Sequence, residues 1–274
     1  MNIVRTAGET LEALRDAKAG AADFRANFFP APAKLQEWID HSELFSDVRE
    51  GAAFFLRKDR GFWHFYFCAA SPAALRREAA KAPVLTTEPV VTDVVGNQPA
   101  LGEILASLES VGFRRYALLE RMALAQPREP SPAPAGDSSV VWAEGPDCSA
   151  VLALIEGAFD RYCEQLPQLY EIQSAVGRRQ VLLAKRNEAV AGLLFFDTQG
   201  LASSLRFWAV APQFRSMRIG SPLMRHYLGT QSSVRRFTLW VNAGNENAIA
   251  KYGHYGYAPD GLVDHVLANH MIQV

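Results

Sequence analysis

The amino-acid sequence predicts a mixed α/β fold made of two similar halves. Strand and helix signals alternate along most of the 274 residues, which is the pattern of a sheet flanked by helices. A Pro-rich stretch at 126–139, QPREPSPAPAGDSS, separates the halves and cannot form a helix or a central strand. We therefore predict a first domain at residues 1–126, a linker at 127–138 and a second domain at 139–274.

In the first half, apolar runs on either side of the turn-like RKDRG predict two paired strands. The predicted elements are strands Ala52–Leu56 and Gly61–Cys68, helix Pro72–Ala80, strand Pro89–Val95, helix Leu101–Val111 and strand Tyr116–Leu124. Upstream, the aromatic segment FRANFF at Phe24–Phe29 and Trp38 are interpreted as core residues, with a lid as the alternative.

In the second half, the turn-like KRNE between two apolar runs predicts a hairpin. The predicted elements are strand Val140–Trp142, helix Cys148–Arg161, strands Gln180–Ala184, Ala189–Phe196 and Ser203–Val210, helix Ser221–Thr230, strand Phe237–Val241, helix Glu246–Tyr252 and strand Leu262–Leu267.

The two halves end alike, which predicts an internal duplication. Each closes with a helix, a glycine, an aromatic residue and a strand, at Gly112-Phe113 and at Gly256-Tyr257. The alternative is that ordinary glycine capping produces this pattern twice. Because the two ends match in the same order of elements, duplication is the hypothesis that we favour.

Composition narrows the class of protein. The formal net charge of -1 gives no reason to expect nucleic acid or an acidic membrane surface as a partner. No apolar run of about 18 residues and no N-terminal apolar signal segment is present, so we expect a cytoplasmic protein. Cys68, Cys148 and Cys163 are far apart, and His265 and His270 lack a third ligand nearby, so no metal is predicted.

The turn after Val210 has the chemistry of a phosphate-binding loop. Pro212 ends a strand, and Pro222 suits the first turn of a helix. The N–H groups between them then lie at a helix N-terminus, where the helix dipole favours an anion. Gly220 permits close approach, while neighbouring arginines add charge-assisted hydrogen bonds. The alternative is a plain strand-to-helix turn.

A second segment follows the strand FTLWV. Asn245 is a good N-cap, and Ala248 and Tyr252 share one face of the helix that it begins. A phenol on that face could donate a proton to a departing thiolate. The alternative is that Tyr252 is an amphipathic core residue.

Together the two segments resemble the GCN5-related N-acetyltransferase (GNAT) superfamily. Its loop R/Q-x-x-G-x-G/A is matched by RSMRIG, with Arg218 in place of the first glycine, a side chain that fits if its φ is negative. Its later motif N-x-x-A-x-x-x-Y-x-x-x-G-F/Y is matched at Asn245, Ala248, Tyr252, Gly256 and Tyr257. The resemblance covers about residues 139–270.

The resemblance implies two tandem GNAT-like domains, each a mixed, mostly antiparallel sheet flanked by helices. It implies an N-acyltransferase in which a primary amine attacks the thioester of acetyl-CoA directly. Tyr252 is then the general acid, and the N–H of Val210 polarises the thioester carbonyl where two strands diverge. The residues expected to bind coenzyme A are Ala209, Val210, Arg215, Ser216, Met217, Arg218, Ile219, Gly220, Ser221, Asn245 and Ala248.

The general base and the acceptor stay open at this point. Many family members carry a carboxylate on the fourth strand, but SSLRFWAV has none. The candidates are Asp197, Asp160 and Glu164, or a water held by Ser203 or Ser204. The acceptor is expected to be a small-molecule or peptide amine, and the protein a monomer or homodimer.

Two other functions compete. A non-catalytic acyl-CoA sensor would need the phosphate-binding loop but not a general acid such as Tyr252. An aminoacyl-tRNA-dependent tandem enzyme would need a basic groove, which the net charge of -1 disfavours. The first half has no glycine in CAASPAALRREAA, so the resemblance implies that it has lost coenzyme A binding and walls the acceptor site.

Overall fold

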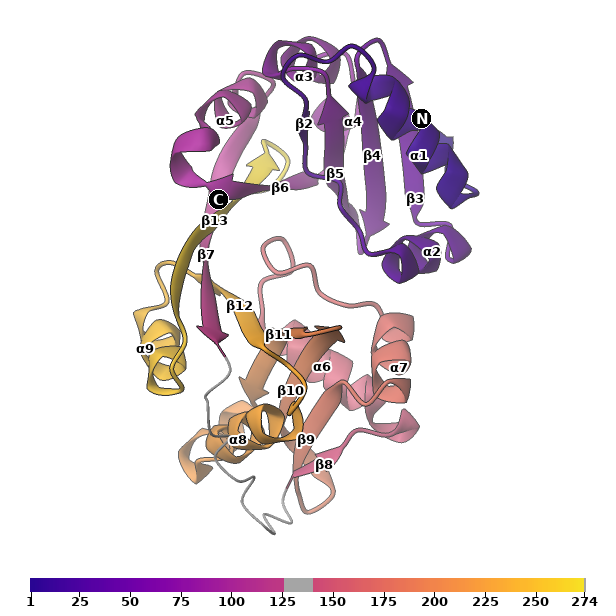
Figure 1. The fold of residues 1–274 in the computed structure, drawn as a ribbon. Coiled ribbons are helices and arrows are strands. Elements are labelled where there is room, and N and C mark those ends of the chain that lie inside the picture. The colour runs from indigo at the N-terminus through magenta and orange to yellow at the C-terminus, as the bar shows by residue number, and fades with distance from the viewer. Residues whose placement is uncertain (126–139, 274) are drawn as a thin grey trace. The chain divides into compact units, whose positions relative to one another are not determined.

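The computed structural model describes residues 1–125 and 140–273 (Figure 1). The linker predicted at 127–138 lies outside the described residues. The chain divides into two compact units: unit 1 is Met1–Glu120 with Gly261–Val274, and unit 2 is Arg121–Asp260.

In unit 1 the sheet order is β1-β3-β4-β5-β6-β13, and β5 and β6 form its one parallel pair within the described residues. The elements are β1 (Asn2–Ile3), α1 (Ala7–Lys18), β2 (Arg25–Ala26), α2 (Pro32–Asp40), β3 (Leu44–Arg49), β4 (Ala52–Asp59), β5 (Phe62–Ala69), α3 (Pro72–Ala79), α4 (Val84–Thr87), β6 (Val90–Asn97), α5 (Gly102–Glu109) and β7 (Phe113–Ala125).

In unit 2 the sheet order is β7-β12-β11-β10-β9-β8, and β11 and β12 are the parallel pair. The elements of this part of the chain are β8 (Val140–Trp142), α6 (Cys148–Ala158), α7 (Leu169–Gly177), β9 (Val181–Arg186), β10 (Ala189–Gln199), β11 (Ala202–Val210), α8 (Gly220–Thr230), β12 (Arg236–Asn242) and α9 (Glu246–His254). They are followed by β13 (Ala258–Asn269), which belongs to unit 1 from Gly261 on.

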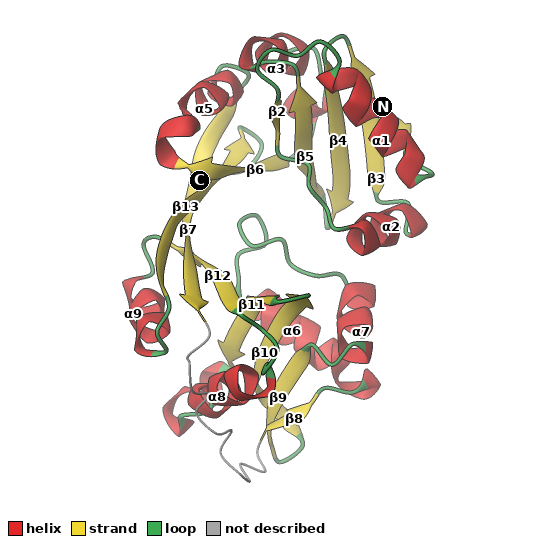
Figure 2. Ribbon diagram, viewed as in Figure 1, coloured by secondary structure: helices red, strands yellow, loops and turns green. Residues whose placement is uncertain are grey.

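The two units repeat one arrangement of helices on a sheet, which confirms the predicted mixed α/β fold and the duplication. In unit 1, α1 and α2 bury their apolar sides on one face of the sheet, and α3 and α5 on the other (Figure 2). In unit 2, α6 and α7 cover one face, and α8 and α9 the other. Gly112 and Gly256 stop α5 and α9 with φ of 101° and 91°, a conformation that favours glycine.

The last strand of each half completes the sheet of the other unit. Residues 262–268 of β13 pair with residues 91–97 of β6, and β7 lies beside β12. The compact second unit therefore begins at Arg121 and ends at Asp260, which differs from the range 139–274 expected from the sequence. Strand exchange of this kind leaves no mark in the local sequence pattern, because each strand keeps its own apolar alternation.

The aromatic segment upstream of α2 belongs largely to the core, as the sequence analysis favours. Phe28 and Trp38 are buried, with Phe28 stacked on Phe55 at 4.1 Å between ring centroids. Phe29 is 79% exposed. Helices α1, α2 and α7 and strand β3 were not predicted from the sequence, because short elements with mixed composition give weak periodicity.

Two further observations concern the length of the helices and the burial of the cysteines. Of the described helices, none is long and apolar enough to cross a membrane. All three cysteines are buried and unpaired with one another, and burial raises the pKa of the Cys68 thiol to about 12.

Unit 2 depends on a close approach of α8 to the sheet at Gly192 of β10. A Cβ at this position would lie 3.0 Å from the carbonyl oxygen of Ala209, 3.1 Å from Ile219 and 3.3 Å from Leu223. Because a backbone atom is one of these neighbours, the site can relax only by moving α8 or a strand.

We predict that Gly192→Ala lowers the free energy of unfolding by about 1–2 kcal/mol, the typical cost of overpacking. Gly157→Ala is the control, since Gly157 has open space around its Cα in α6 and alanine favours a helix. Urea denaturation measures both variants. Equal stability of Gly192→Ala and the wild type would contradict the packing described for α8.

Candidate functional site

The two parallel strands at the centre of unit 2 separate part-way along their length. β11 and β12 pair over four positions, from Ala202 opposite Arg236 to Leu205 opposite Leu239. β11 then stays paired with β10 as far as Val210. The outer half of β11 therefore has one edge that β12 does not cover.

The backbone of Val210 faces that uncovered edge. The N–H of Ala211 donates to the carbonyl oxygen of Ala191 on the β10 side, at 2.9 Å. Consecutive N–H groups along a strand point to opposite sides. The N–H of Val210 therefore points toward the space that β12 has left.

A β-bulge at Arg206 marks the point of separation. Phe207 lies opposite Phe195, but Leu205 lies opposite Phe196, so Arg206 is the extra residue on β11. An extra residue reverses the alternation of side chains along a strand. Leu205 accordingly packs in the core under α8, whereas Phe207 packs in the core under α6 and α7.

After the bulge, Trp208 faces α8 and α9. Its ring centroid lies 5.7 Å from that of Tyr252 and 5.9 Å from that of Tyr255. A Cβ on Gly220 would lie 3.0 Å from the indole ring. Gly220 thus allows the first turn of α8 to lie directly against β11. The side chain of Ala209 is buried on the opposite face. A ligand beside β11 would therefore contact this residue through its backbone.

The predicted phosphate loop connects β11 to α8. It consists of the 3₁₀ helix Pro212–Met217, then Arg218, then the buried Ile219, and α8 begins at Gly220. Ile219, the N-cap residue of α8, makes no side-chain capping hydrogen bond. The first-turn N–H groups of α8 are therefore directed at solvent or an anion. The predicted residues 215–217 lie in the 3₁₀ helix, with Arg215 and Met217 exposed.

Arg218 has a conformation that the sequence analysis did not expect. Its φ is 53°, in the left-handed region, so the condition under which its side chain would fit the loop, a negative φ, is not met. A side chain in this region costs about 1–2 kcal/mol relative to glycine, which gives a physical reason for a glycine in the family pattern. The guanidinium is exposed, so this strained residue also places a positive charge beside the loop.

The second motif forms helix α9 as predicted. The side chain of Asn245 accepts from the N–H of Ala248 at 3.1 Å and caps the helix. Ala248 and Tyr252 share the face that packs on the core of unit 2. Ser221 Oγ lies 2.9 Å from Tyr255 Oη, a hydrogen bond that joins the first turn of α8 to the end of α9.

The charge of Glu164 acts on the Tyr252 phenol. Burial, and then the charge of Glu164, raise the pKa of the Tyr252 phenol above its ordinary value, so it stays protonated. Burial, and then the charge of Asp160, raise the pKa of Glu164 to about 7, with Arg206 acting in the opposite direction. The site thus holds a neutral proton donor and a carboxyl that exchanges its proton near neutral pH.

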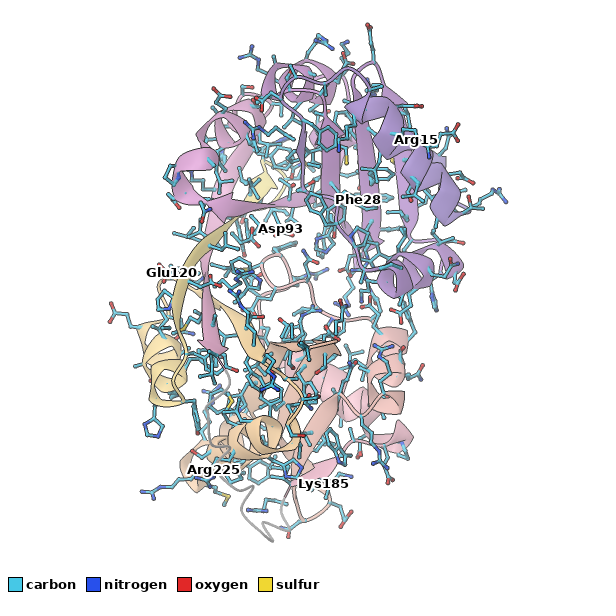
Figure 3. All side chains as sticks on the ribbon, viewed as in Figure 1. Arg15, Phe28, Asp93, Glu120, Lys185 and Arg225 are labelled. Carbon is cyan, nitrogen blue, oxygen red and sulfur yellow. The ribbon has the colours of Figure 1, made fainter. Side chains whose placement is uncertain are left out.

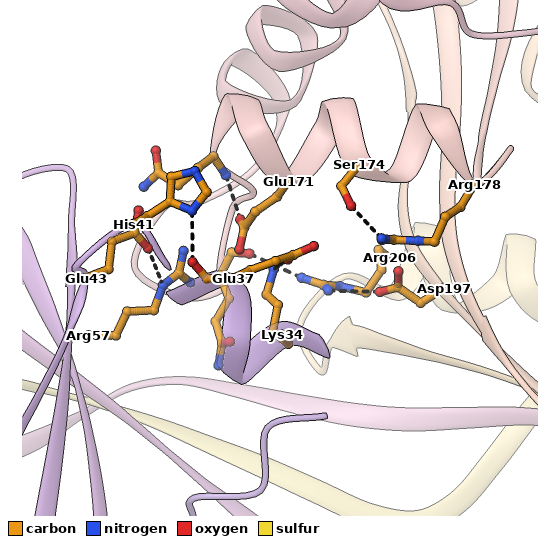
Figure 4. Close-up of polar contacts among 12 residues, drawn as sticks. Lys34, Glu37, His41, Glu43, Arg57, Glu171, Ser174, Arg178, Asp197 and Arg206 are labelled. Carbon is orange, nitrogen blue, oxygen red and sulfur yellow. Dashed lines mark hydrogen bonds and ion pairs between the residues drawn. The ribbon is translucent and has the colours of Figure 1, made fainter. Parts of the chain in front are cut away.

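The bulge holds the segment that carries Glu164. Arg206 donates from Nη2 to the carbonyl oxygen of Gln165 at 3.2 Å. It also pairs from Nη1 with Asp197 Oδ2 at 3.2 Å (Figure 4). Asp197 is therefore engaged as the counter-ion of Arg206, and Glu164 is the adjacent carboxyl whose proton affinity suits a base.

Ser203 lies in the paired part of β11, before the strands separate. Its hydroxyl is buried and hydrogen-bonded to Tyr227 Oη at 2.8 Å and to Thr198 Oγ1 at 3.0 Å. Among the described residues, no group of three or more His, Cys, Asp or Glu side chains could hold a metal ion.

Comparison with known proteins identifies the domain. The sequence model of the family described as Acetyltransferase (GNAT) family matches residues 149–257. These residues form a GNAT domain. The match includes β11, the loop before α8, α9 and the segment of Glu164, which is every element of the candidate site. Members of this acyltransferase family generally use acetyl-CoA.

Solved structures extend the likeness to the whole chain. A tandem GNAT protein from the clavulanic acid biosynthesis pathway, solved without AcCoA, has a TM-score of 0.62 at 15% identity, over 99% of this chain and 98% of that one. A GCN5-related N-acetyltransferase from Sphaerobacter thermophilus gives 0.56 at 15% identity, over 90% and 95%. One from Kribbella flavida gives 0.56 at 14%, over 87% and 93%. These likenesses concern the fold, and they confirm the tandem GNAT architecture. The comparison with curated proteins gave no match.

Three residues of the candidate site were missed or left open by sequence reasoning. Arg206 appears in the sequence as a charged residue within a strand, and nothing local shows that it is the bulge. Glu164 was one of several acids, and only its burial and its proximity in space to Asp160 and Arg206 distinguish it. Trp208 was not predicted to belong to the site either, although its indole ring lies directly against Gly220.

We predict that Arg218→Gly exceeds Met217→Gly in free energy of unfolding by about 1–2 kcal/mol, because only residue 218 has the left-handed backbone that disfavours a side chain. Met217 is the matched control, since it is the preceding residue and is exposed. Chemical denaturation compares the two variants directly. If they are equally stable, the left-handed geometry at Arg218 is refuted.

Proposed function

We propose that the protein is an N-acyltransferase that transfers the acetyl group of acetyl-CoA to a primary amine by direct attack. The observation that carries the proposal is the separation of β11 and β12 beside an uncapped helix N-terminus. The uncapped turn of α8 suits the pyrophosphate, and the uncovered edge of β11 suits the extended arm of the coenzyme.

The residues proposed to hold acetyl-CoA act mainly through their backbones. The N–H groups of the loop and first turn, residues 215–221, would bind the pyrophosphate, and Arg215 and Arg218 would add charge. Gly220 allows close approach, and the hydrogen bond between Ser221 and Tyr255 fixes the turn. The Asn245 cap and small Ala248 keep α9 in place beside the edge of β11.

The uncovered N–H of Val210 is directed to the space where a thioester carbonyl would lie. A fixed donor of this kind stabilises the negative charge that develops on the carbonyl oxygen during attack. The site needs no reorganisation to provide it, because β10 holds β11 rigidly through this position.

Two protons must move, and one residue is proposed for each. The new bond joins the amine nitrogen to the acyl carbon, and the bond from that carbon to sulfur breaks. Glu164 would accept the proton that the nitrogen loses. Tyr252, which stays protonated, would give a proton to the thiolate that leaves. The remaining contribution is alignment of the two reactants.

The acceptor is proposed to be a cationic small molecule or a peptide amine. Asp160, Glu164 and Asp197 lie around the bulge with Arg206, so this part of the site has more carboxyl groups than cations. A surplus of carboxyl groups favours a positively charged substrate. Calorimetry with acetyl-CoA, followed by acetylation assays on a library of amines, tests the proposal. Binding without turnover on any amine would favour an acyl-CoA sensor instead.

We predict that Tyr252→Phe lowers kcat by about 10²–10⁴, the usual contribution of a general acid, and leaves the Kd for acetyl-CoA unchanged. The phenyl ring keeps the packing against Trp208, so the variant removes only the proton donor. Steady-state kinetics and calorimetry measure the two quantities. Unchanged kcat would remove Tyr252 as the acid.

We predict that kcat of the wild type rises with pH through about 7 as Glu164 loses its proton, and that Glu164→Gln abolishes this rise and lowers kcat by about 10²-fold. Glu188→Gln, in the exposed turn between β9 and β10, is the control. Titration of the acceptor amine affects all three enzymes equally. A pH profile of Glu164→Gln that follows the wild type would assign the base elsewhere.

A further inference from the structure

Unit 1 contains the same parallel strand pair as unit 2, and this pair also separates. β5 and β6 pair at two positions, Trp63 opposite Val90 and His64 opposite Val91. Beyond them the two strands diverge, as β11 and β12 do after Leu205. By its place in the repeat, this gap in unit 1 corresponds to the proposed acyl-CoA position in unit 2.

The gap in unit 1 is filled by the chain itself. The short strand β2 pairs with β5 there, with Arg25 opposite Ala69 and Ala26 opposite Cys68. The next residue, Asn27, donates its own N–H to the carbonyl oxygen of Phe67 at 3.0 Å. The segment that connects α1 to α2 therefore takes the edge of β5 that β6 leaves.

The side chain of Asn27 bridges the two separated strands. Its Oδ1 accepts from the N–H of Phe67 at 2.6 Å, and its Nδ2 lies 3.5 Å from the carbonyl oxygen of Phe65, both on β5. Nδ2 also donates to Thr92 Oγ1 at 3.0 Å and to the carbonyl oxygen of Asp93 at 2.8 Å, both on β6. One amide thus satisfies backbone groups on both sides of the gap, which would otherwise need another partner.

Apolar packing anchors this segment next to Asn27. Phe28 is 3% exposed and stacks on Phe55 of β4. Figure 3 labels Phe28 and Asp93, the residues that fix the segment to β4 and to β6. A buried aromatic ring resists release of the segment, because leaving the core would expose it.

The helix N-terminus that follows β5 is also satisfied internally. Ser71 caps α3, and its Oγ accepts from the N–H of Ala74 at 3.1 Å. In the corresponding helix of unit 2, α8, the N-cap residue Ile219 makes no such hydrogen bond. Both features that suit acetyl-CoA in unit 2 are therefore occupied by protein groups in unit 1.

We propose that the segment Arg25–Asn27 is a permanent internal substitute for the coenzyme in unit 1, so that each chain binds one acyl-CoA, in unit 2. The stoichiometry rests on the proposed function of unit 2, whereas the closure of unit 1 stands on its own contacts. In unit 2 the connection between α6 and α7, residues 159–168, forms no strand and supplies Glu164 instead. The same connection thus closes the gap in one unit and supplies a catalytic carboxylate in the other.

Hydrogen–deuterium exchange of the whole protein, with and without acetyl-CoA, tests the proposal. The amides of Asn27 and Phe67 should be protected without ligand and unchanged by it, while amides at 206–221 should gain protection. Calorimetry should give one site per chain, and Ser221→Asp should abolish all binding, since a carboxylate at the first turn of α8 repels the pyrophosphate. Two sites, residual binding by Ser221→Asp, or added protection at 63–72 would overturn the proposal.

A substitution in the segment provides an independent test. Asn27→Asp places a carboxylate against the carbonyl oxygens of Phe65 and Asp93, so Tm should fall by several degrees and exchange at Phe67 should accelerate at least about tenfold. Asn97→Asp, at the exposed end of β6, is the matched control and should do neither. Fast exchange of Phe67 in the wild type would overturn the closure even if Asn27→Asp fails to fold. If acetyl-CoA slows amide exchange in neither unit, the function proposed for unit 2 is wrong. The Asn27→Asp variant then tests only whether the segment Arg25–Asn27 closes the gap in unit 1.

Discussion

The departure of β12 from β11 after Leu205 is the constraint on which the rest of unit 2 depends. A sheet normally satisfies both edges of a central strand, so this departure leaves backbone groups that something else must satisfy. The bulge at Arg206 occurs at the same point and turns Trp208 toward α8 and α9. Gly220 then lets α8 begin against the indole ring, and the bulged side chain holds the carbonyl of Gln165. The loop before α8, Tyr252 and Glu164 thus lie near one another because one strand pair separates.

The two units show two solutions to the same structural problem. In unit 1 the exposed edge of β5 is satisfied by β2 and by the amide of Asn27. In unit 2 the matching connection carries Glu164, and the uncovered edge is available to a ligand. Duplication followed by this division of roles explains why one half keeps the glycine of the loop and the tyrosine of the last helix while the other keeps neither.

Two destabilising features lie where chemistry is proposed. Arg218 adopts a left-handed backbone beside the first turn of α8, and Glu164 carries a raised pKa in a half-buried position. Each costs stability that the surrounding cores of unit 2 must offset. The buried hydroxyl network of Ser203, Thr198 and Tyr227, by contrast, is fully engaged in holding β11 to α8, which explains a polar residue at that core position without a catalytic role.

The sequence alone determined the features that depend on local chemistry. It predicted the α/β class, the strand-to-helix turn before Gly220, the Asn245 cap and the shared face of Ala248 and Tyr252, because propensity and spacing act over a few residues. Tertiary structure decided the exchange of β7 and β13, the bulge at Arg206, the raised pKa of Glu164 and the closure of unit 1 by Asn27. Each of these depends on contacts between segments far apart in the chain, and a side chain's burial and electrostatic partners exist only once those segments have met.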